Sequence, residues 1–282
     1  MKLSALKNSA GVYGLVALDE AYVLAELMGL SLKEPSHEEI LQSILAMLTR
    51  VYSEHATGVV FDPVYSLPFL DQKHDQAGTV IRLEQPAPPD PLTVPKFPPN
   101  WGIEHIRNLY GVAKLELYYH PAEETASAKK KLVSEVFDFC QYEKIDFLLK
   151  LIIYHPPKET LTTAQFQEVQ LEAISELQRS ANLLAVQYPQ DPLAAATLTS
   201  ELDIPWLMID DGVKYDKFKD QLRVALENGA QGFLVDEVLW QEVGKMRLKD
   251  QSPDLPAIEK FLQTTSKDRM IELMRIAGEE RE

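Results

Sequence analysis

Short apolar runs alternate with longer amphipathic segments along nearly the whole of this 282-residue chain. Eight of the runs have the length and near-continuous apolar character of strands that are covered on both faces. Eight strand and helix pairs within about 240 residues match an α/β fold in which parallel strands close into a (β/α)8, or TIM, barrel. We therefore predict a single-domain TIM barrel with strands at residues 13–19, 58–62, 79–84, 113–119, 147–154, 182–188, 206–210 and 232–237.

The segments between these runs carry apolar residues at helical spacing, which predicts the outer ring of helices. Examples are residues 38–55, 128–144, 166–180 and 215–229, the last of which ends in the helix stop signal Asn228-Gly229. We expect residues 1–265 to form the barrel, and residues 266–282 to form a C-terminal helix with an acidic tail.

The charge balance argues against two classes of partner. The chain has 43 Asp and Glu against 28 Lys and Arg, a net charge of −15. Affinity for nucleic acid or anionic membrane comes from Lys and Arg, so neither is expected as a partner. Cys140 is the single cysteine and lies at helical spacing from apolar residues, which predicts a core thiol. With no internal disulfide possible and no apolar leader or membrane-length run, we expect a cytoplasmic protein.

In a TIM barrel the chemistry lies where strands end and strand-to-helix loops begin. Polar residues at these positions are therefore candidates for a site. They are Asp19, Glu20, Asp62, Glu84, Lys114, Glu116, Lys150, Gln187, Asp210, Asp211, Asp236 and Glu237.

Lys114 and Lys150 are the most informative candidates because both stand within apolar strands. Burial disfavours the charged amine, so the pKa of such a lysine is expected to fall toward the range of a Schiff-base nucleophile. The alternative for Lys114 is a buried ion pair with an acid such as Glu116 or Asp62.

The third strand-to-helix connection, residues 85–100, carries seven prolines. It cannot be helical before Trp101, and its stiff extended backbone is expected to project over the mouth of the barrel. The segment from Pro86 to Pro99 is therefore either a lid or docking surface for a protein partner, or a rigid surface strap without a ligand.

The order and spacing of several motifs resemble the tagatose-bisphosphate aldolase family, between about Leu15 and Trp240. That resemblance implies a class I (β/α)8 aldolase, which cleaves ketose bisphosphates through a lysine imine. The motifs that carry it are ALDEAYVLAELM, GVVFDPVYSLP, YGVAKLELYYHP, FLLKLIIYH, NLLAVQYP, MIDDGV and ENGAQGFLVDEVLW.

The resemblance implies that Asp19 and Lys114 match family site residues. It also implies that the imine-forming lysine of the sixth strand is replaced by Ala185, and that the family's glutamate in the fifth strand is replaced by Lys150. In the first strand the family's D-Q-R-G motif becomes Asp19-Glu20-Ala21-Tyr22, which loses an arginine.

The family's phosphate-binding positions also differ, because carboxylates Asp210, Asp236 and Glu237 stand at the ends of the seventh and eighth strands. Two like charges about 4 Å apart repel by roughly 4 kcal/mol at an effective dielectric of 20. A sugar bisphosphate is therefore expected to bind badly.

Three functions fit these residues. The first is a pseudoenzyme that has lost the lysine and the phosphate site and acts in protein interaction or in sensing a small uncharged or cationic ligand. The second is an active lyase on a non-phosphorylated carbonyl compound, with Lys150 forming the imine, Lys114 polarising it, and Asp19 or Glu116 moving protons.

The third function is a Mg²⁺ or Mn²⁺ enzyme that uses Asp62, Glu84, Asp210 and Asp236 as oxygen ligands. In the first reading, which we favour, Gln187, Asp210, Asp236 and Glu237 would contact the ligand and no metal or cofactor is expected. The outer helices would also permit a homodimer.

Overall fold

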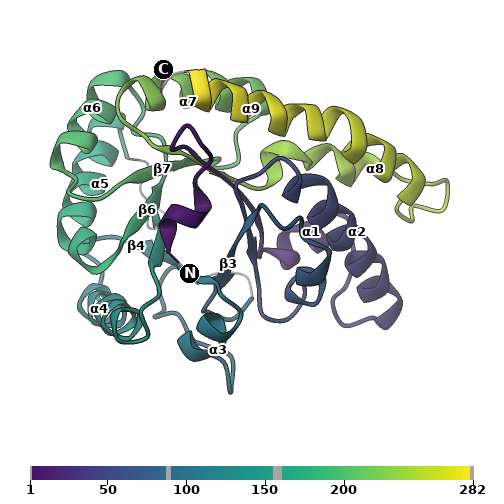
Figure 1. Ribbon diagram of the computed structural model, residues 1–282, viewed down its shortest axis with the longest axis horizontal. Helices are drawn as coiled ribbons and strands as arrows, with labels where there is room; N and C mark the ends of the chain where they lie inside the picture. The colour runs from purple at the N-terminus through teal and green to yellow at the C-terminus, as the bar shows by residue number, and fades with distance from the viewer. Residues whose placement is uncertain (1, 87–89, 155–160, 280–282) are drawn as a thin grey trace.

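The computed structural model describes residues 2–86, 90–154 and 161–279. Parallel strands close into a barrel in which each strand pairs with its sequence neighbours and β8 pairs with β1 (Figure 1). The predicted (β/α)8 fold is therefore confirmed. The strands are β1 (Tyr13–Leu18), β2 (Gly58–Phe61), β3 (Gly78–Arg82), β4 (Val112–Tyr119), β5 (Phe147–Ile153), β6 (Leu183–Val186), β7 (Trp206–Ile209) and β8 (Gly232–Val235).

The alternation of side chains along each strand decides what fills the barrel. One set of buried apolar residues forms the interior, including Leu15, Val80, Val112 and Leu148. The opposite set packs against the helices in a second, larger cluster. Residues two and four positions beyond an interior residue therefore point into the barrel at its C-terminal end.

A ring of helices surrounds the strands, and Figure 1 looks along the barrel at this ring. The helices form where the sequence predicts them; α5, for example, begins with a capping box in which Thr162 and Gln165 satisfy each other's backbone N–H groups. They are α1 (Ala21–Leu27), α2 (Pro35–Ser53), α3 (Ile103–Asn108), α4 (Ala126–Tyr142), α5 (Thr163–Leu177), α6 (Pro192–Glu201), α7 (Tyr215–Glu227), α8 (Leu255–Phe261) and α9 (Lys267–Glu279).

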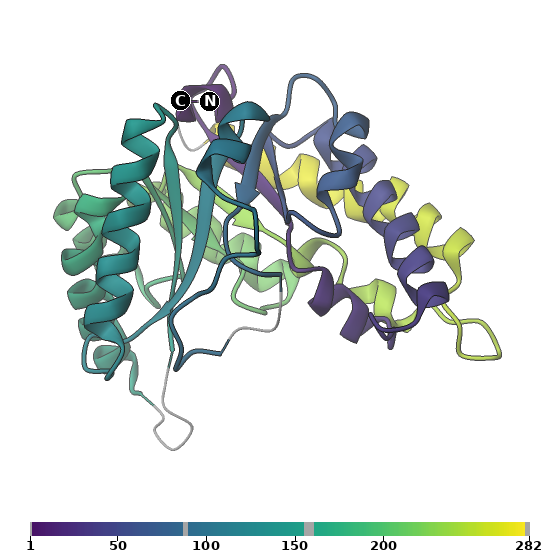
Figure 2. The same ribbon diagram turned by 90° about the horizontal axis from the view of Figure 1, so that it is seen from below.

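An N-terminal 3-10 turn, Leu3–Leu6, closes the end of the barrel opposite the strand ends. Leu6 is fully buried among the interior residues. A Cβ at Gly78 would lie 2.3 Å from the Leu6 Cδ2 atom, so this close approach requires glycine. Figure 2 shows the barrel from the side, with the turn at the upper end and the strand-to-helix loops at the lower end.

Helix α9 follows a π-helical turn at Leu262–Ser266, which contains the boundary expected at residue 265. Its apolar face, which includes Met270, Leu273 and Ile276, is buried in the core that surrounds the barrel. The end of the expected acidic tail, residues 280–282, lies outside the described residues. Within the described part of the chain, no helix has the length and apolar character needed to cross a bilayer.

Cys140 lies fully buried on α4. Burial raises the pKa of its thiol to about 12, with Asp146 adding to the shift. The thiolate is therefore scarce near neutral pH, as expected for a core thiol.

Candidate functional site at the barrel mouth

Charged side chains meet at the C-terminal ends of the strands, inside the barrel. The alternation that directs Leu15, Val80 and Leu148 inward also directs polar residues of the same parity inward, near the ends of the same strands. Glu20 and Asp210 have the opposite parity but follow β1 and β7 directly and contact these residues at the strand ends. We call the whole group the mouth cluster. It comprises Asp19, Glu20, Arg82, Glu84, Lys114, Glu116, Lys150, Asp210 and Asp236.

Lys114 forms the deepest contacts of the mouth cluster. Its Nζ atom lies 2.5 Å from Oδ2 of Asp19 and 3.7 Å from Oε2 of Glu116, and its side chain is fully buried. Arg82 donates to the carbonyl oxygen of Asp19 at 3.0 Å, and its Nε atom lies 2.7 Å from Oε1 of Glu84. Lys114 is thus a buried ion-pair partner, with Asp19 rather than Asp62 as its nearest acid.

Lys150 lies nearer the opening and contacts three carboxyl groups. Its Nζ atom is 2.7 Å from Glu20 Oε1, 2.7 Å from Glu116 Oε2 and 3.8 Å from Asp236 Oδ2. Burial alone would lower the pKa of Lys150, but the surrounding carboxylates outweigh it and hold this pKa well above its usual value. The expectation of a lowered pKa is therefore wrong for Lys150, because the acids that surround it come from other strands and loops.

Glu116 and Glu20 both contact Lys150, but their pKa values shift in opposite directions. Burial acts to raise the pKa of Glu116, but Lys150, Lys114 and Arg82 hold it well below its usual value. Burial raises the pKa of Glu20 to about 8, and the charge of Glu116 adds to this shift. Near neutral pH, Glu116 is therefore ionised and Glu20 is largely protonated.

Two further acids lie beside Glu20 and Lys150: Asp210 follows β7 and Asp236 follows β8. Oδ2 of Asp210 accepts hydrogen bonds from the backbone N–H groups of Val238 at 2.9 Å and Asp236 at 3.3 Å. Burial and the neighbouring Asp210 raise the pKa of Asp236 to about 8. Burial also raises the pKa of Glu237, with Asp236 adding to the effect. The predicted crowding of carboxylates at these strand ends is thus present, and proton uptake relieves part of the repulsion.

Gln187 and Asp62 lie at strand ends but their side chains serve loop structure. Oε1 of Gln187 accepts from the backbone N–H of Ile153 at 2.8 Å. Oδ1 of Asp62 accepts from the backbone N–H groups of Val64 and Tyr65. Among the described residues, no group of three or more His, Cys, Asp or Glu side chains is arranged to hold a metal ion. The four-carboxylate metal site is therefore not assembled, because Asp62 and Glu84 already bond to other groups.

Two cavities open beside the mouth cluster, and Tyr118 lines both. The larger, of about 290 Å³, lies between the ends of β3 and β4 and residues 90–96, which we call the strap. The smaller, of about 140 Å³, is lined by Glu20, Lys150, Asp210 and Asp236. The proline-rich connection therefore borders the mouth, as predicted, although residues 87–89 lie outside the described part.

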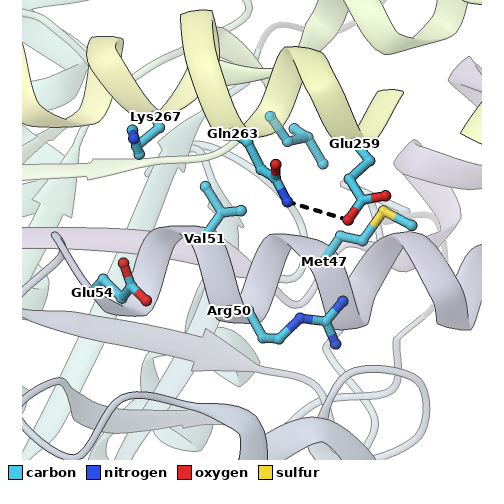
Figure 3. A pocket seen from close by; sticks show the side chains of 8 residues that line it. Met47, Arg50, Val51, Glu54, Glu259, Gln263 and Lys267 are labelled. Atoms are coloured by element: carbon cyan, nitrogen blue, oxygen red, sulfur yellow. Dashed lines mark hydrogen bonds between the residues drawn. The ribbon is translucent and has the colours of Figure 1, made fainter. Parts of the chain in front are cut away.

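A third cavity, of about 390 Å³, lies on the outside of the barrel between α2 and the α8–α9 segment (Figure 3). Side chains of both charge signs line it, and Gln263 donates to Glu259 across one turn at 3.2 Å. It contains none of the mouth residues.

The sequence reasoning missed Arg82 and Tyr118. Arg82 stands within the run TVIRLE, and its parity with Val80 places it inside the barrel. Tyr118 has the same parity as Lys114 and Glu116 on β4. Counting every second residue along the strand from a residue that points into the barrel identifies both.

No family model matches the chain. Its sequence is nevertheless similar to tagatose 1,6-diphosphate aldolases over most of its length. The enzyme of Staphylococcus epidermidis is 20% identical over 284 residues, covering 87% of this chain and 86% of the relative. Tagatose 1,6-diphosphate aldolase 2 of Streptococcus pyogenes is 22% identical over 275 residues, covering 85% of this chain and 84% of the relative.

Solved aldolase structures share the fold. An archaeal fructose-1,6-bisphosphate aldolase, with its catalytic lysine covalently bound to the carbinolamine intermediate of the substrate, has a TM-score of 0.64 at 16% identity, covering 93% of this chain and 96% of that one. Fructose-bisphosphate aldolase of Plasmodium falciparum has a TM-score of 0.67 at 12% identity, covering 97% and 92%. The chain is therefore an aldolase-like (β/α)8-barrel protein with weak but consistent similarity to the tagatose 1,6-diphosphate aldolases.

Proposed function

We propose that this protein is a non-catalytic aldolase-like barrel that binds a small, non-phosphorylated ligand at its mouth. The observation that carries the proposal is the environment of Lys150, the lysine nearest the opening. It pairs in register with Ala185, the position where the family resemblance places the imine-forming lysine. It is also bound to Glu20 and Glu116 at 2.7 Å each.

Imine formation requires a neutral amine, and the surroundings of Lys150 oppose one. Attack on a carbonyl compound uses the nitrogen lone pair and ends in the loss of water, so the ammonium form is inactive. Ionised Glu116 stabilises that ammonium and holds the pKa of Lys150 well above its usual value, and Glu20 adds to this effect when it loses its proton. Lys114, the other lysine of the mouth cluster, is fully buried against Asp19.

The crowding of Asp210, Asp236 and Glu237 supports a ligand without phosphate. Phosphate groups bind where backbone N–H groups or cations converge. Here the backbone N–H groups of Val238, Asp236 and Glu237 already donate to Asp210 or Asp236. An incoming phosphate would find these donors occupied by carboxylates.

Borohydride trapping tests the proposal. The protein is incubated at pH 7.5 with dihydroxyacetone, fructose and fructose 1,6-bisphosphate, reduced with sodium borohydride and mapped by mass spectrometry, beside an active class I aldolase as positive control. We expect no adduct on Lys150 or Lys114. An adduct on Lys150 that is absent from Lys150→Met would contradict the proposal.

The second candidate is an active lyase on a non-phosphorylated carbonyl compound with Lys150 as the Schiff-base lysine. It is favoured by one observation: Glu20, with a pKa of about 8, lies 2.7 Å from Lys150 Nζ and could move a proton near neutral pH. The same trapping experiment at pH 7.5 and pH 9.5 decides it, because an adduct that grows with pH is its signature.

Docking of a protein partner on the segment from Pro86 to Pro99, and formation of a homodimer, stay predictions of the sequence. A pull-down with the chain lacking residues 86–99 tests the first, and sedimentation equilibrium tests the second. An unchanged pull-down profile would count against the docking role.

A further inference from the structure

We propose that exposed aromatic side chains at the closed end of the barrel form the interface at which two copies of this chain dimerise. Tyr110 follows α3, and Phe139 and Tyr142 lie in the last turn of α4. We call these three residues the aromatic face. Tyr110 and Tyr142 are each 77% exposed, and Phe139 is 41% exposed. Both segments lead into the start of a strand, which places them at the end that the N-terminal turn closes.

The two segments of the aromatic face are joined to each other. Helices α3 and α4 follow one another around the barrel (Figure 1). Arg107, in the last turn of α3, forms an ion pair with Glu143, the C-cap residue of α4. The rings of Phe139 and Tyr142 stack, with centroids 6.1 Å apart and planes at 9°. The three rings therefore lie on one side of the molecule, beside the same ion pair.

The backbone of Tyr110 is strained, although its ring gains little burial within the protomer. Its φ angle is 56°, in the left-handed region that favours glycine and asparagine over a bulky residue. Such strain persists where something else compensates for it, and it is concentrated at functional positions. Packing inside this chain does not compensate for it, because most of the side chain is exposed. Contact with another molecule would.

The exposed area suits the centre of a dimer interface. A buried Phe or Tyr side chain contributes about 150–250 Å², so the exposed parts of the three residues amount to roughly 300–500 Å². An apolar patch of this size on a monomer is often functional. A standard interface buries about 800 Å² on each partner. The aromatic face would thus supply the apolar centre, and the charged residues around it would supply the rim.

The charges that border the aromatic face favour a second copy of this chain as the partner. The chain has a net charge of −15, so two copies repel each other unless the surfaces in contact are nearly neutral. Three bordering acids already pair with bases of the same protomer, which leaves little net charge to attract a strongly basic or acidic partner. The pairs are Glu143 with Arg107, Asp146 with Lys2, and Glu135 with Lys131.

Two further charges are placed to pair across a two-fold axis. Asp138 and Lys144 are both exposed, and they lie at equal separations in the sequence before and after Gln141. Antiparallel packing of two copies of this segment about Gln141 sets each aspartate opposite the lysine of the other copy. A two-fold interface is self-complementary in this way, since residue i contacts residue j and j contacts i.

Sedimentation equilibrium between about 1 and 100 µM tests the proposal. The protein is used without a fused handle, because Lys2 pairs with Asp146 beside the aromatic face. We expect reversible association from monomer to dimer. Tyr142→Ser should weaken it at least about tenfold. Leu193→Ser is the matched control and should leave it unchanged, because Leu193 on α6 is also 77% exposed but lies outside the aromatic face.

Exchange of charges tests the two-fold arrangement. Asp138→Lys should weaken the dimer at least about tenfold, because it sets like charges opposite each other twice. The double variant Asp138→Lys/Lys144→Asp should recover affinity to within about threefold of the wild type. A role of either residue within the protomer alone would give no such rescue.

Tyr110→Asn separates the strain from the contact. Asparagine tolerates the left-handed backbone, so this variant should weaken the dimer and at the same time raise the urea midpoint of the monomer.

A wild type that stays monomeric up to about 100 µM would overturn the proposal. Equal dimer affinity in Tyr142→Ser and Leu193→Ser, assembly beyond a dimer, a double variant no tighter than Asp138→Lys, or a lower urea midpoint in Tyr110→Asn would overturn it too. None of these substitutions is at the mouth of the barrel, so the outcomes are independent of borohydride trapping.

Discussion

The Nζ atom of Lys114 on β4 lies 2.5 Å from Oδ2 of Asp19 at the end of β1, joining two strands that are not neighbours in the barrel. Both side chains are fully buried, so each is the other's main compensation for lost hydration. This pair makes the mouth cluster part of the structure of the barrel as well as a candidate site.

Replacing Lys114 with Met should destabilise the protein by about 3–5 kcal/mol, because Asp19 would remain buried without its ammonium partner. The free energy of unfolding is measured by urea titration. The double variant Asp19→Leu/Lys114→Met should lose less than the sum of the two single variants. Lys131→Met is the control: Lys131 is 76% exposed, and its loss should cost less than about 0.5 kcal/mol. Simple additivity of the two buried substitutions would contradict this coupling.

Stability should fall as the pH rises from about 4.5 to about 8. Glu20 and Asp236 have pKa values near 4 in the unfolded chain but about 8 in the folded one, so the folded state binds more protons across this window. Each proton contributes a slope of at most about 1.4 kcal/mol per pH unit. Urea midpoints between pH 5 and pH 8.5 measure the effect.

The variant Glu20→Gln assigns part of that slope. The amide imitates the protonated carboxyl and does not titrate, so this variant should show a shallower fall between pH 5 and pH 8.5 than the wild type. A slope identical to that of the wild type would show that Glu20 does not take up a proton on folding.

Lys129→Met should release the strap. Lys129 is fully buried and donates to the carbonyl oxygen of Pro91 and to both carboxylate oxygens of Glu123. Without these bonds, hydrogen exchange at residues 92–94 should accelerate, while exchange in β1 stays near its wild-type rate. Lys130→Met, which removes an exposed pair with Glu176, is the matched control on the same helix. Equal exchange in the two variants would exclude the tether.

Gly78→Ala should cost about 1–3 kcal/mol, because the new Cβ would lie 2.3 Å from Leu6 Cδ2 and 3.1 Å from the carbonyl oxygen of Ala5. In a Leu6→Ala background the same change should cost less, since the first clash disappears. Thermal unfolding of the four proteins of this cycle measures the coupling. A cost that is independent of residue 6 would mean that the N-terminal turn moves aside freely.

The hydrophobic pattern of the sequence predicts where the strands lie, but it does not predict which charged residues of the mouth cluster contact one another. The apolar run 147–154, interrupted only by Lys150, identifies β5, and alternation then places Lys150 inside the barrel. Its partner Glu20 lies 130 residues earlier in the chain and meets it only when the barrel closes. The direction of the Lys150 pKa shift depends on that meeting. Local sequence therefore suggests the opposite direction, since it contains the burial but not the carboxylates.

Gln187 shows a second limit of prediction from the sequence. Its place just after β6 makes it a reasonable ligand-binding candidate, but the neighbouring strand β5 leaves a backbone N–H at Ile153 that needs an acceptor. The side chain of Gln187 supplies that acceptor. Competition between the needs of the backbone and those of a ligand is not visible in the sequence, because it depends on the loops that follow each strand.

The N-terminal turn Leu3–Leu6 also determines how molecules reach the barrel. With Leu6 inserted among the interior residues, that end is closed, and the two mouth cavities lie at the opposite end of the strands. An affinity handle fused ahead of Lys2 would therefore lie at the closed end of the barrel. A sensor chip that captures the protein by such a handle would present the mouth to flowing solution, the orientation in which weak small-molecule binding is easiest to record.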